Sequence, residues 1–410
     1  MTNADTNRNL NEILVHLQSD FSKELTNLLE FWATKCIDET HGGFIGKMDH
    51  FGQIDPKASK GCILNTRILW TFSAAYRTTG KDSYRLLAAQ AYDYVRQYFW
   101  DPVNGGLYWD LDVTGTPIST KKQAYAQGFG LYAFSEFYRA TGNEESLSYA
   151  KELYAILETK FWESKFGGYV EALTDDWKAM DDVRLSEKDL NTPKSMNTHL
   201  HILEPYTNLY RVWPDEKLKT SIASLLQIFC QKIFNSNTNH LKLFFSLDWK
   251  SQFEEVSFGH DIEAAWLMNE ASMAINKGAI EGRVHSITRL LVEATKKEGL
   301  DKDGSIFYER HGALLDKHKH WWCQAEGMVG FMDAFELDGN KSYIQEVELL
   351  WTFIKYFIKD EKNGEWFWRV DEHNQPINSE DKVGFWKGPY HNGRALMELI
   401  ERIDKQIQVF

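Results

Sequence analysis

The chain of 410 residues is 43% hydrophobic and 26% charged, which is typical of a folded globular protein and excludes a largely disordered one. Its formal net charge of -13 is spread along the sequence without a basic cluster. We therefore expect a small neutral partner rather than a nucleic acid or an anionic membrane. The four cysteines lie far apart with no CxxC pair, so neither a disulfide framework nor a zinc site is predicted.

The N-terminal segment MTNADTNRNL lacks the basic and apolar regions of a signal peptide. No apolar run approaches the roughly 20 residues that a membrane-spanning helix needs. We therefore expect a cytoplasmic protein without a membrane partner, and a monomer. No phosphate loop, GxGxxG fingerprint or GxSxG elbow occurs, which argues against a nucleotide-dependent enzyme or a serine hydrolase.

Helical periodicity alternates with short turns along the whole chain. It predicts twelve helices in six pairs, over residues 8–35, 58–79, 82–99, 120–141, 144–162, 192–213, 215–235, 257–275, 279–299, 318–338, 341–359 and 388–405.

Glycine-aromatic turns separate the pairs, at 41–44, 104–109, 166–169, 303–308 and 363–368. Their first glycines lie 63, 62, 137 and 60 residues apart, and the long interval holds a degenerate copy at 237–245. Six such units predict an all-α fold, a closed (α/α)6 barrel with short β-hairpin segments at one mouth and a single domain over residues 1–410. An open solenoid of the same helical hairpins is the alternative.

Polar and aromatic residues interrupt the apolar helices near their starts. If alternate helices form an inner ring, these starts converge at one mouth and make a single pocket. The residues are Arg67, Tyr125, Asn197, His201, His260, Trp322, Glu326 and His391.

His260 and Glu263 share a helical face, so the carboxylate could orient or charge the imidazole. The alternative is a solvent-capped histidine with an exposed Glu263. One histidine and one glutamate are too few ligands for a metal site. Near the C-terminus, Trp386 and His391 flank Pro389, which suits the first position of a helix. Packing of His391 in the last seam of the barrel is the alternative there.

The segment Asn197–His201 contains two histidines that would point about 200° apart in a helix. His201 shares the i, i+4 face with Asn197 and is assigned to the pocket, which leaves His199 peripheral. Arg67 is flanked by apolar residues and needs an anionic partner, either a developing oxyanion on a substrate or a structural carboxylate.

Trp322 and Glu326 lie on one helical face, which suits stacking on a sugar ring and accepting from its hydroxyls. Core packing of Trp322 is the alternative.

Four segments, Asn65–Trp70, Gly259–Ala264, Trp321–Glu326 and Pro389–Arg394, strongly resemble the cellobiose 2-epimerases of the N-acylglucosamine 2-epimerase superfamily, and the resemblance runs essentially end to end. It implies an (α/α)6 barrel that exchanges the proton at C2 of a glucose or mannose unit at a free reducing end, with no cofactor and no metal.

The resemblance also implies residue roles. His260 and His391 would be the acid/base pair, one on each face of a planar intermediate. His201 would assist ring opening or hold the ring oxygen, and Arg67 would steady the enediolate. The remaining residues would bind the sugar, line its mouth or orient histidines: Tyr125, Asp189, Asn197, Glu263, Trp322, Glu326 and Trp386.

The chemistry accounts for two histidines. C2 of an aldose becomes acidic once the ring opens and the C1 aldehyde can delocalise charge, and configuration inverts only if the proton returns to the opposite face. Two groups with an unperturbed pKa of about 6.5 can exchange the roles of acid and base.

Three other readings stay open. Free mannose and glucose could be the substrates, and Arg184 could pair with Glu254 or Glu255 to close a loop over the pocket and exclude a second sugar. From another class, a glycoside hydrolase could use Glu263 and Glu326 as its two carboxylates. A non-catalytic sugar-binding protein is the third.

Overall fold

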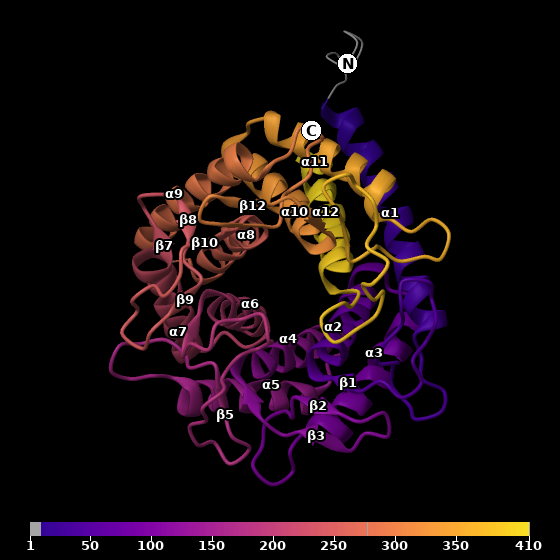
Figure 1. Ribbon diagram of the computed structural model, residues 1–410, viewed down its shortest axis with the longest axis vertical. Helices are drawn as coiled ribbons and strands as arrows, with labels where there is room; N and C mark the ends of the chain where they lie inside the picture. The colour runs from indigo at the N-terminus through magenta and orange to yellow at the C-terminus, as the bar shows by residue number, and fades with distance from the viewer. Residues whose placement is uncertain (1–9, 277, 410) are drawn as a thin grey trace.

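Six helical hairpins close into two concentric rings in the computed structural model, which describes residues 10–276 and 278–409 (Figure 1). The inner ring consists of α2 (Cys62–Thr79), α4 (Ala124–Thr141), α6 (Met196–Val212), α8 (Phe258–Ile275), α10 (Trp321–Asp338) and α12 (Tyr390–Val409). The outer ring consists of α1 (Leu10–Lys35), α3 (Asp82–Tyr94), α5 (Glu144–Ile156), α7 (Glu216–Ile228), α9 (Gly278–Ala294) and α11 (Ser342–Phe353).

Each inner helix packs against the next one, and α12 packs against both α1 and α2. The last hairpin therefore closes the ring onto the first, as the meeting of indigo and yellow ribbons shows (Figure 1). The fold is the predicted (α/α)6 barrel, and the open solenoid is excluded. Residues 8 and 9 of the first predicted helix, and the N-terminal segment before them, lie outside the described residues.

Five of the outer helices end in a π-helical turn of five residues. These turns are η2 (Val95–Phe99), η3 (Leu157–Phe161), η4 (Phe229–Ile233), η5 (Thr295–Gly299) and η6 (Ile354–Ile358). The predicted helices over 82–99, 144–162, 215–235, 279–299 and 341–359 each contain one α-helix and its π-helical turn, because periodicity does not distinguish the two.

The turn repeat is confirmed by one antiparallel contact in each unit. The residue pairs are Ile37 with Phe44, Trp100 with Leu107, Trp162 with Tyr169, Phe234 with Leu241, Leu300 with Ile306, and Lys359 with Trp366. The degenerate copy forms the same hairpin without glycine, because Asn239 takes the left-handed conformation with φ 60°.

Short strands follow these turns and precede the inner helices. They are β1 (Lys60–Gly61), β2 (Asp110–Leu111), β3 (Pro117–Ser119), β4 (Lys122–Gln123), β5 (Ala172–Leu173), β6 (Lys194–Ser195), β7 (Phe234–Asn235), β8 (His240–Leu241), β9 (Phe244–Phe245), β10 (Glu255–Ser257), β11 (Glu309–His311), β12 (Leu314–Asp316), β13 (Lys319–His320) and β14 (Arg369–Val370). The antiparallel sheets are β1-β2-β3, β10-β11-β12, β4-β5, β6-β9, β7-β8 and β13-β14. The predicted starts at 58, 120, 192 and 318 are three to four residues early, because extended residues precede these helices.

A buried lysine ties most turns to the start of an inner helix. Lys122 of β4 donates to Asp101 at 2.8 Å and to the carbonyl of Gly105 at 3.0 Å. Four equivalent ion pairs join Lys60 to Asp38, Lys194 to Glu163, Lys319 to Asp301 and Lys382 to Asp360. These lysines fix the mouth of the barrel, where the inner helices begin.

All four cysteines are buried, and none of them forms a disulfide. Among the described residues, no helix is both long enough and apolar enough to span a bilayer.

Candidate active site

The first turn of four inner helices carries a side chain that binds the neighbouring turn segment. The backbone N–H groups of Leu107, Tyr169, Leu241 and Ile306 donate to Gln127, His199, Asp261 and Gln324, over 2.7, 2.9, 2.8 and 2.8 Å. His199 therefore occupies a structural position, and it is fully buried outside the cavity lining.

A residue two positions further along a helix points about 200° away. Phe129, His201, Glu263 and Glu326 therefore turn toward the barrel axis. The repeat thus assigns alternate residues of each helix start to the scaffold and to the centre of the barrel.

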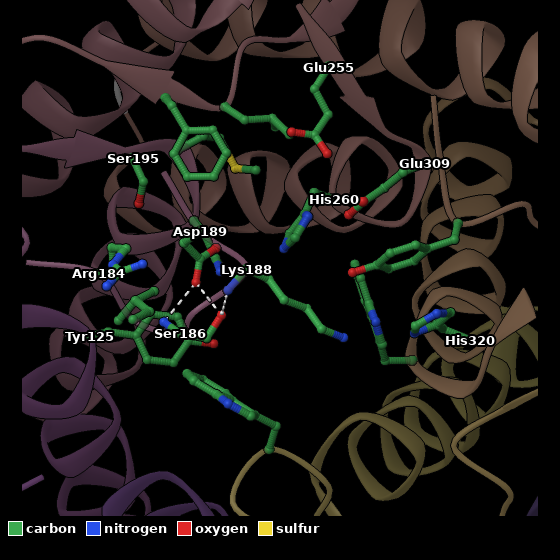
Figure 2. A pocket seen from close by; sticks show the side chains of 18 of the residues that line it. Tyr125, Arg184, Ser186, Lys188, Asp189, Ser195, Glu255, His260, Glu309 and His320 are labelled. Carbon is green, nitrogen blue, oxygen red and sulfur yellow. Dashed lines mark hydrogen bonds between the residues drawn. The ribbon is translucent and has the colours of Figure 1, made fainter. Parts of the chain in front are cut away.

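A cavity of about 750 Å³ opens where the inner helices begin (Figure 2). Ten of the eleven predicted site residues line it: Arg67, Tyr125, Asp189, Asn197, His201, His260, Glu263, Trp322, Trp386 and His391. Glu326 does not line it. Its Oε1 accepts from His391 Nδ1 at 2.7 Å and its Oε2 from Trp266 Nε1 at 3.1 Å, so it lies behind His391.

His260 and His391 flank the ring of Trp322. The ring centroids lie 4.7 Å apart for His260 and Trp322, and 5.7 Å apart for His391 and Trp322. The two histidines come from α8 and α12 on either side of α10, and both face the same cavity. Burial lowers the pKa of His260 to about 4 and that of His391 well below its usual value.

The expected contact between His260 and Glu263 is wrong. His260 Nδ1 is bonded to the hydroxyl of Ser257 over 2.8 Å, whereas Glu263 Oε1 accepts from Arg394 at 2.8 Å. Glu263 also lies 3.9 Å from His391 Nδ1. The i, i+3 spacing is present, but the buried guanidinium of Arg394 is a stronger partner than an imidazole.

One guanidinium, that of Arg394, organises the base of the cavity. It donates to Glu204 through Nη1, and through Nη2 to Glu263 over 2.8 Å and to Glu326 over 2.6 Å. Arg67 is the second guanidinium nearby, so three buried carboxyl groups face two cations. Burial raises the pKa of Glu263 to about 8 and the pKa of Glu326 well above its usual value, so burial favours the protonated form of these carboxyl groups.

His201 has its own carboxylate. Its Nδ1 lies 3.0 Å from Glu204, which also accepts from the hydroxyl of Tyr390. Burial lowers the pKa of His201 well below its usual value, and the charge of Arg67 acts in the same direction. His201 is therefore held as a neutral imidazole with a fixed ring.

Arg67 lies between two aromatic rings, 4.6 Å from the centroid of Phe129 and 5.0 Å from that of Tyr390. It donates to the carbonyl of Trp386 at 2.9 Å and to the hydroxyl of Tyr125 at 3.0 Å. Over the described residues it has no salt bridge, and its buried Nε has no partner. The sequence predicted either a substrate oxyanion or a structural carboxylate as the partner of Arg67. Among the described residues, no carboxylate forms a salt bridge with it.

The segment 181–191 covers one side of the cavity. Asp189 accepts from the backbone N–H and the hydroxyl of Ser186, over 2.8 and 2.6 Å, and Lys188 reaches into the cavity (Figure 2). The expected pairing of Arg184 with Glu254 or Glu255 is wrong. Arg184 donates to Asp182 over 2.9 and 2.8 Å, because a carboxylate two residues away is the nearer partner.

Among the residues that the structure describes, two groups of side chains each bring three potential metal ligands within 4.8 Å of one another. In the first, Glu263, Glu326 and His391, both carboxylates already accept from Arg394, whose charge opposes a cation. The second, Glu255, Glu309 and His311, lies at the cavity rim.

Sequence reasoning missed Ser257, Glu204 and Arg394. Each stands three residues from a predicted histidine, at 260, 201 and 391, so helical spacing alone could have found them.

The comparisons with known proteins identify the family and agree with the fold. The model of the family N-acylglucosamine 2-epimerase (GlcNAc 2-epimerase) matches residues 43–394. A cellobiose 2-epimerase of Bacteroides fragilis is 44% identical over 94% of this chain and 98% of its own. The solved structure of the cellobiose 2-epimerase from Bacillus thermoamylovorans B4167 superimposes with a TM-score of 0.92 at 39% identity, over 95% of this chain and all of the other.

A D-mannose isomerase of Marinomonas mediterranea is more distant, at 25% identity over 92% of this chain and 95% of its own. The matching family model and the identity over nearly the full length establish that this chain belongs to the N-acylglucosamine 2-epimerase family and is a carbohydrate 2-epimerase.

Proposed function

We propose that this protein interconverts the glucose and mannose configurations at C2 of the reducing-end unit of cellobiose, with His260 and His391 as its acid/base pair. The observation that carries the proposal is the pair of imidazoles that both pack against Trp322 and face one cavity. Epimerisation needs one proton acceptor and one proton donor on opposite faces of the same carbon, and two such imidazoles supply both.

The reaction begins with opening of the sugar ring. His201 is the group for this step, because its Nδ1 is fixed by Glu204 and its other ring nitrogen is left for the ring oxygen or O1. Opening exposes the C1 aldehyde, which makes the proton at C2 acidic.

One histidine then takes the proton from C2, and the electron pair delocalises onto the C1 oxygen to give a cis-enediolate. Arg67 lines the cavity and its Nε has no hydrogen-bond partner, which supports a role for this guanidinium in stabilising the negative oxygen. The second histidine returns a proton to C2 from the opposite face, which inverts the configuration. The ring closes, and the net change is the exchange of one proton.

Two observations support a disaccharide as the substrate. Relatives with 44% and 38% identity over 94% of this chain are cellobiose 2-epimerases, whereas the D-mannose isomerase is 25% identical. The cavity of about 750 Å³ lies in the upper part of the range for ligand sites, and the aromatic rings of Trp322 and Trp386 line it. Both features favour a disaccharide over a free hexose.

The test is incubation in D2O with cellobiose and, separately, with mannose, while NMR follows the C2 proton. Wild type should incorporate deuterium at C2 as the epimer forms, faster with cellobiose. His260→Ala and His391→Ala should each abolish formation of the epimer, while His373→Ala, at an exposed histidine, should match wild type. Released glucose without an epimer would instead indicate hydrolysis, and sugar binding without exchange would indicate a non-catalytic protein.

A further inference from the structure

We propose that Ser257 is a positioning residue that makes the acid/base pair asymmetric: its hydroxyl keeps His260 the neutral base at rest, while His391 and Glu326 together hold the proton to be exchanged. This inference rests on the proposed roles of His260 and His391.

Ser257 occupies the N-cap position of α8 but makes no capping hydrogen bond there. A serine at this position normally accepts from the backbone N–H of the second or third helical residue. Ser195, at the N-cap of α6, does so with the N–H of Thr198. Ser257 instead bonds to His260 Nδ1 over 2.8 Å. The Ser257 hydroxyl therefore binds the imidazole of His260 instead of capping a backbone N–H at the start of α8.

The hydroxyl of Ser257 can accept from Nδ1–H, so it allows His260 the tautomer that a base needs. If Nδ1–H donates to the Ser257 oxygen, the lone pair of Nε2 is free on the other side of the ring. The ring of His260 projects into the cavity (Figure 2). A neutral imidazole with its proton on Nδ1 is the form that can accept a proton from C2.

The two histidines differ in what stands behind them. His391 Nδ1 lies 2.7 Å from Glu326, so an added proton there neutralises a carboxylate. His260 has a neutral hydroxyl in the same position, so its protonation creates a charge in a half-buried site without a carboxylate as its hydrogen-bond partner. The contact between His391 and Glu326 is therefore the better place for the proton that is exchanged.

The other charged groups around the pair carry both signs. Arg67, His391 and His201 line the cavity together with His260, and so do the carboxyl groups of Glu263, Asp189, Glu255 and Glu309. Glu309 of β11 is the register partner of Ser257, and Lys188 enters the cavity from the segment 181–191. Around His391, Glu326 and Glu263 are opposed by Arg67, His260 and Lys387. Of the two imidazoles, only that of His391 has a carboxylate as its hydrogen-bond partner in the described structure.

The decisive variant is Ser257→Asp, which gives His260 a carboxylate of its own. The pH dependence of kcat/KM for C2 exchange reports the pKa values of the free enzyme. We expect the acidic limb of this profile to move up by about 1 to 3 pH units, because an adjacent opposite charge raises the pKa of the base by that amount.

Two further variants separate positioning from folding. Ser257→Thr keeps the hydroxyl and should keep the profile and most of the rate. Ser257→Ala should lower kcat by about tenfold to a hundredfold through a misplaced imidazole, without moving the acidic limb upward. Asn143→Ala removes a true N-cap, at the start of the outer helix α5, and should change stability but not the profile.

Deuterium exchange by the wild type, and its loss in His260→Ala, are measured first, so a failure of the proposed function is seen separately. Two results would overturn the role of Ser257. One is an acidic limb in Ser257→Asp that coincides with that of wild type. The other is a Ser257→Ala enzyme with the rate and profile of wild type.

Discussion

At the scale of the residue, Arg67 is a buried hydrogen-bond donor that has no anionic side chain as its partner among the described residues. Its faces are covered by Phe129 and Tyr390, and among the described residues its hydrogen bonds go only to neutral oxygens. Loss of one preorganised donor to an oxyanion lowers a rate by about 10² to 10³. We therefore expect Arg67→Met to lower kcat for cellobiose by that factor with little change in KM, measured by initial rates.

Arg85→Met is the matched control, since this guanidinium is surface-exposed and bonded to Asp82. It should leave both constants unchanged. A raised KM with an unchanged kcat in Arg67→Met would mean that Arg67 binds the sugar in its ground state, and the oxyanion role would be withdrawn.

The contacts of Glu204 allow a test of how much a buried charge contributes to stability. Glu204 accepts from His201, from the hydroxyl of Tyr390 and from Arg394, and it is 3% exposed. Glu204→Gln removes the anion while Arg394 keeps Glu263 and Glu326 as partners, so it should lower the free energy of unfolding by about 1.5 to 3 kcal/mol, measured by urea denaturation. Tyr390→Phe removes one donor to the same carboxylate and should cost only about 1 kcal/mol. Equal losses in the two variants would contradict the role of the charge.

At the scale of the element, the buried lysines hold the turns against the inner helices. Lys122 and Asp101 are both almost fully buried, and the ammonium also donates to the carbonyl of Gly105. Lys122→Met leaves the carboxylate of Asp101 without its cation, so we expect a loss of about 3 to 5 kcal/mol in unfolding free energy. The double variant Lys122→Met/Asp101→Leu should recover part of this loss. Additive effects of the two substitutions would show that the ion pair is not coupled.

The same pair predicts a dependence on pH. Burial raises the pKa of Asp101, but hydrogen bonds from Lys122 and from two backbone N–H groups outweigh it and bring the pKa to about 2. The folded pKa lies below the unfolded value of about 3.9, so the stabilisation is present above pH 4 and is lost as the pH falls toward 2. Unfolding free energies at pH 6 and pH 3 should therefore differ more in wild type than in the double variant.

Periodicity predicted the six units, the pairing of helices and the side of the barrel on which the polar residues gather. It could not place the helix starts to the residue, because Lys122 and Gln123 are extended and belong to β4, although their side chains suit a helix. The histidines were found from their own positions, but of their hydrogen-bond partners only Glu326 was among the predicted residues, while Ser257 and Glu204 were not. Glu263 and His260 share a helical face, yet the choice between Arg394 and the imidazole depends on α12, which is 131 residues from Glu263.

At the scale of the whole molecule, polar links join the inner helices into a closed ring at their C-terminal ends, away from the cavity. Consecutive helices from α2 to α12 and back to α2 are joined by Arg77 with Glu136, Ser135 with Asn208, Arg211 with Glu270, Asn269 with Asp333, Asp333 with Arg402, and Glu401 with Arg77. The ring holds the far end of the barrel as the lysines hold its mouth.

Arg402 has more acidic neighbours than any other member of this ring. Its substitution therefore tests how much the ring contributes to stability. Arg402 donates to Asp333 over 3.1 Å and to Glu336, and it lies 3.4 Å from Glu398. Burial raises the pKa of Asp333 to about 6, while Arg402 acts against this rise. Arg402→Met should lower the unfolding free energy by about 3 to 5 kcal/mol at pH 7.5, because it leaves buried carboxylates without a cation.

The loss should be smaller at pH 5, and the sign follows from linkage. A carboxyl group whose folded pKa lies above its unfolded value contributes stability below the unfolded pKa and loses it as the pH rises through the folded pKa. Without Arg402 the folded pKa of Asp333 rises further, so the penalty grows between pH 5 and pH 7.5. Urea denaturation at the two pH values measures it, and C2 exchange by the folded variant should match wild type because the ring is remote from the cavity. An equal loss at both pH values would mean that Arg402 stabilises the barrel by packing rather than by its charge.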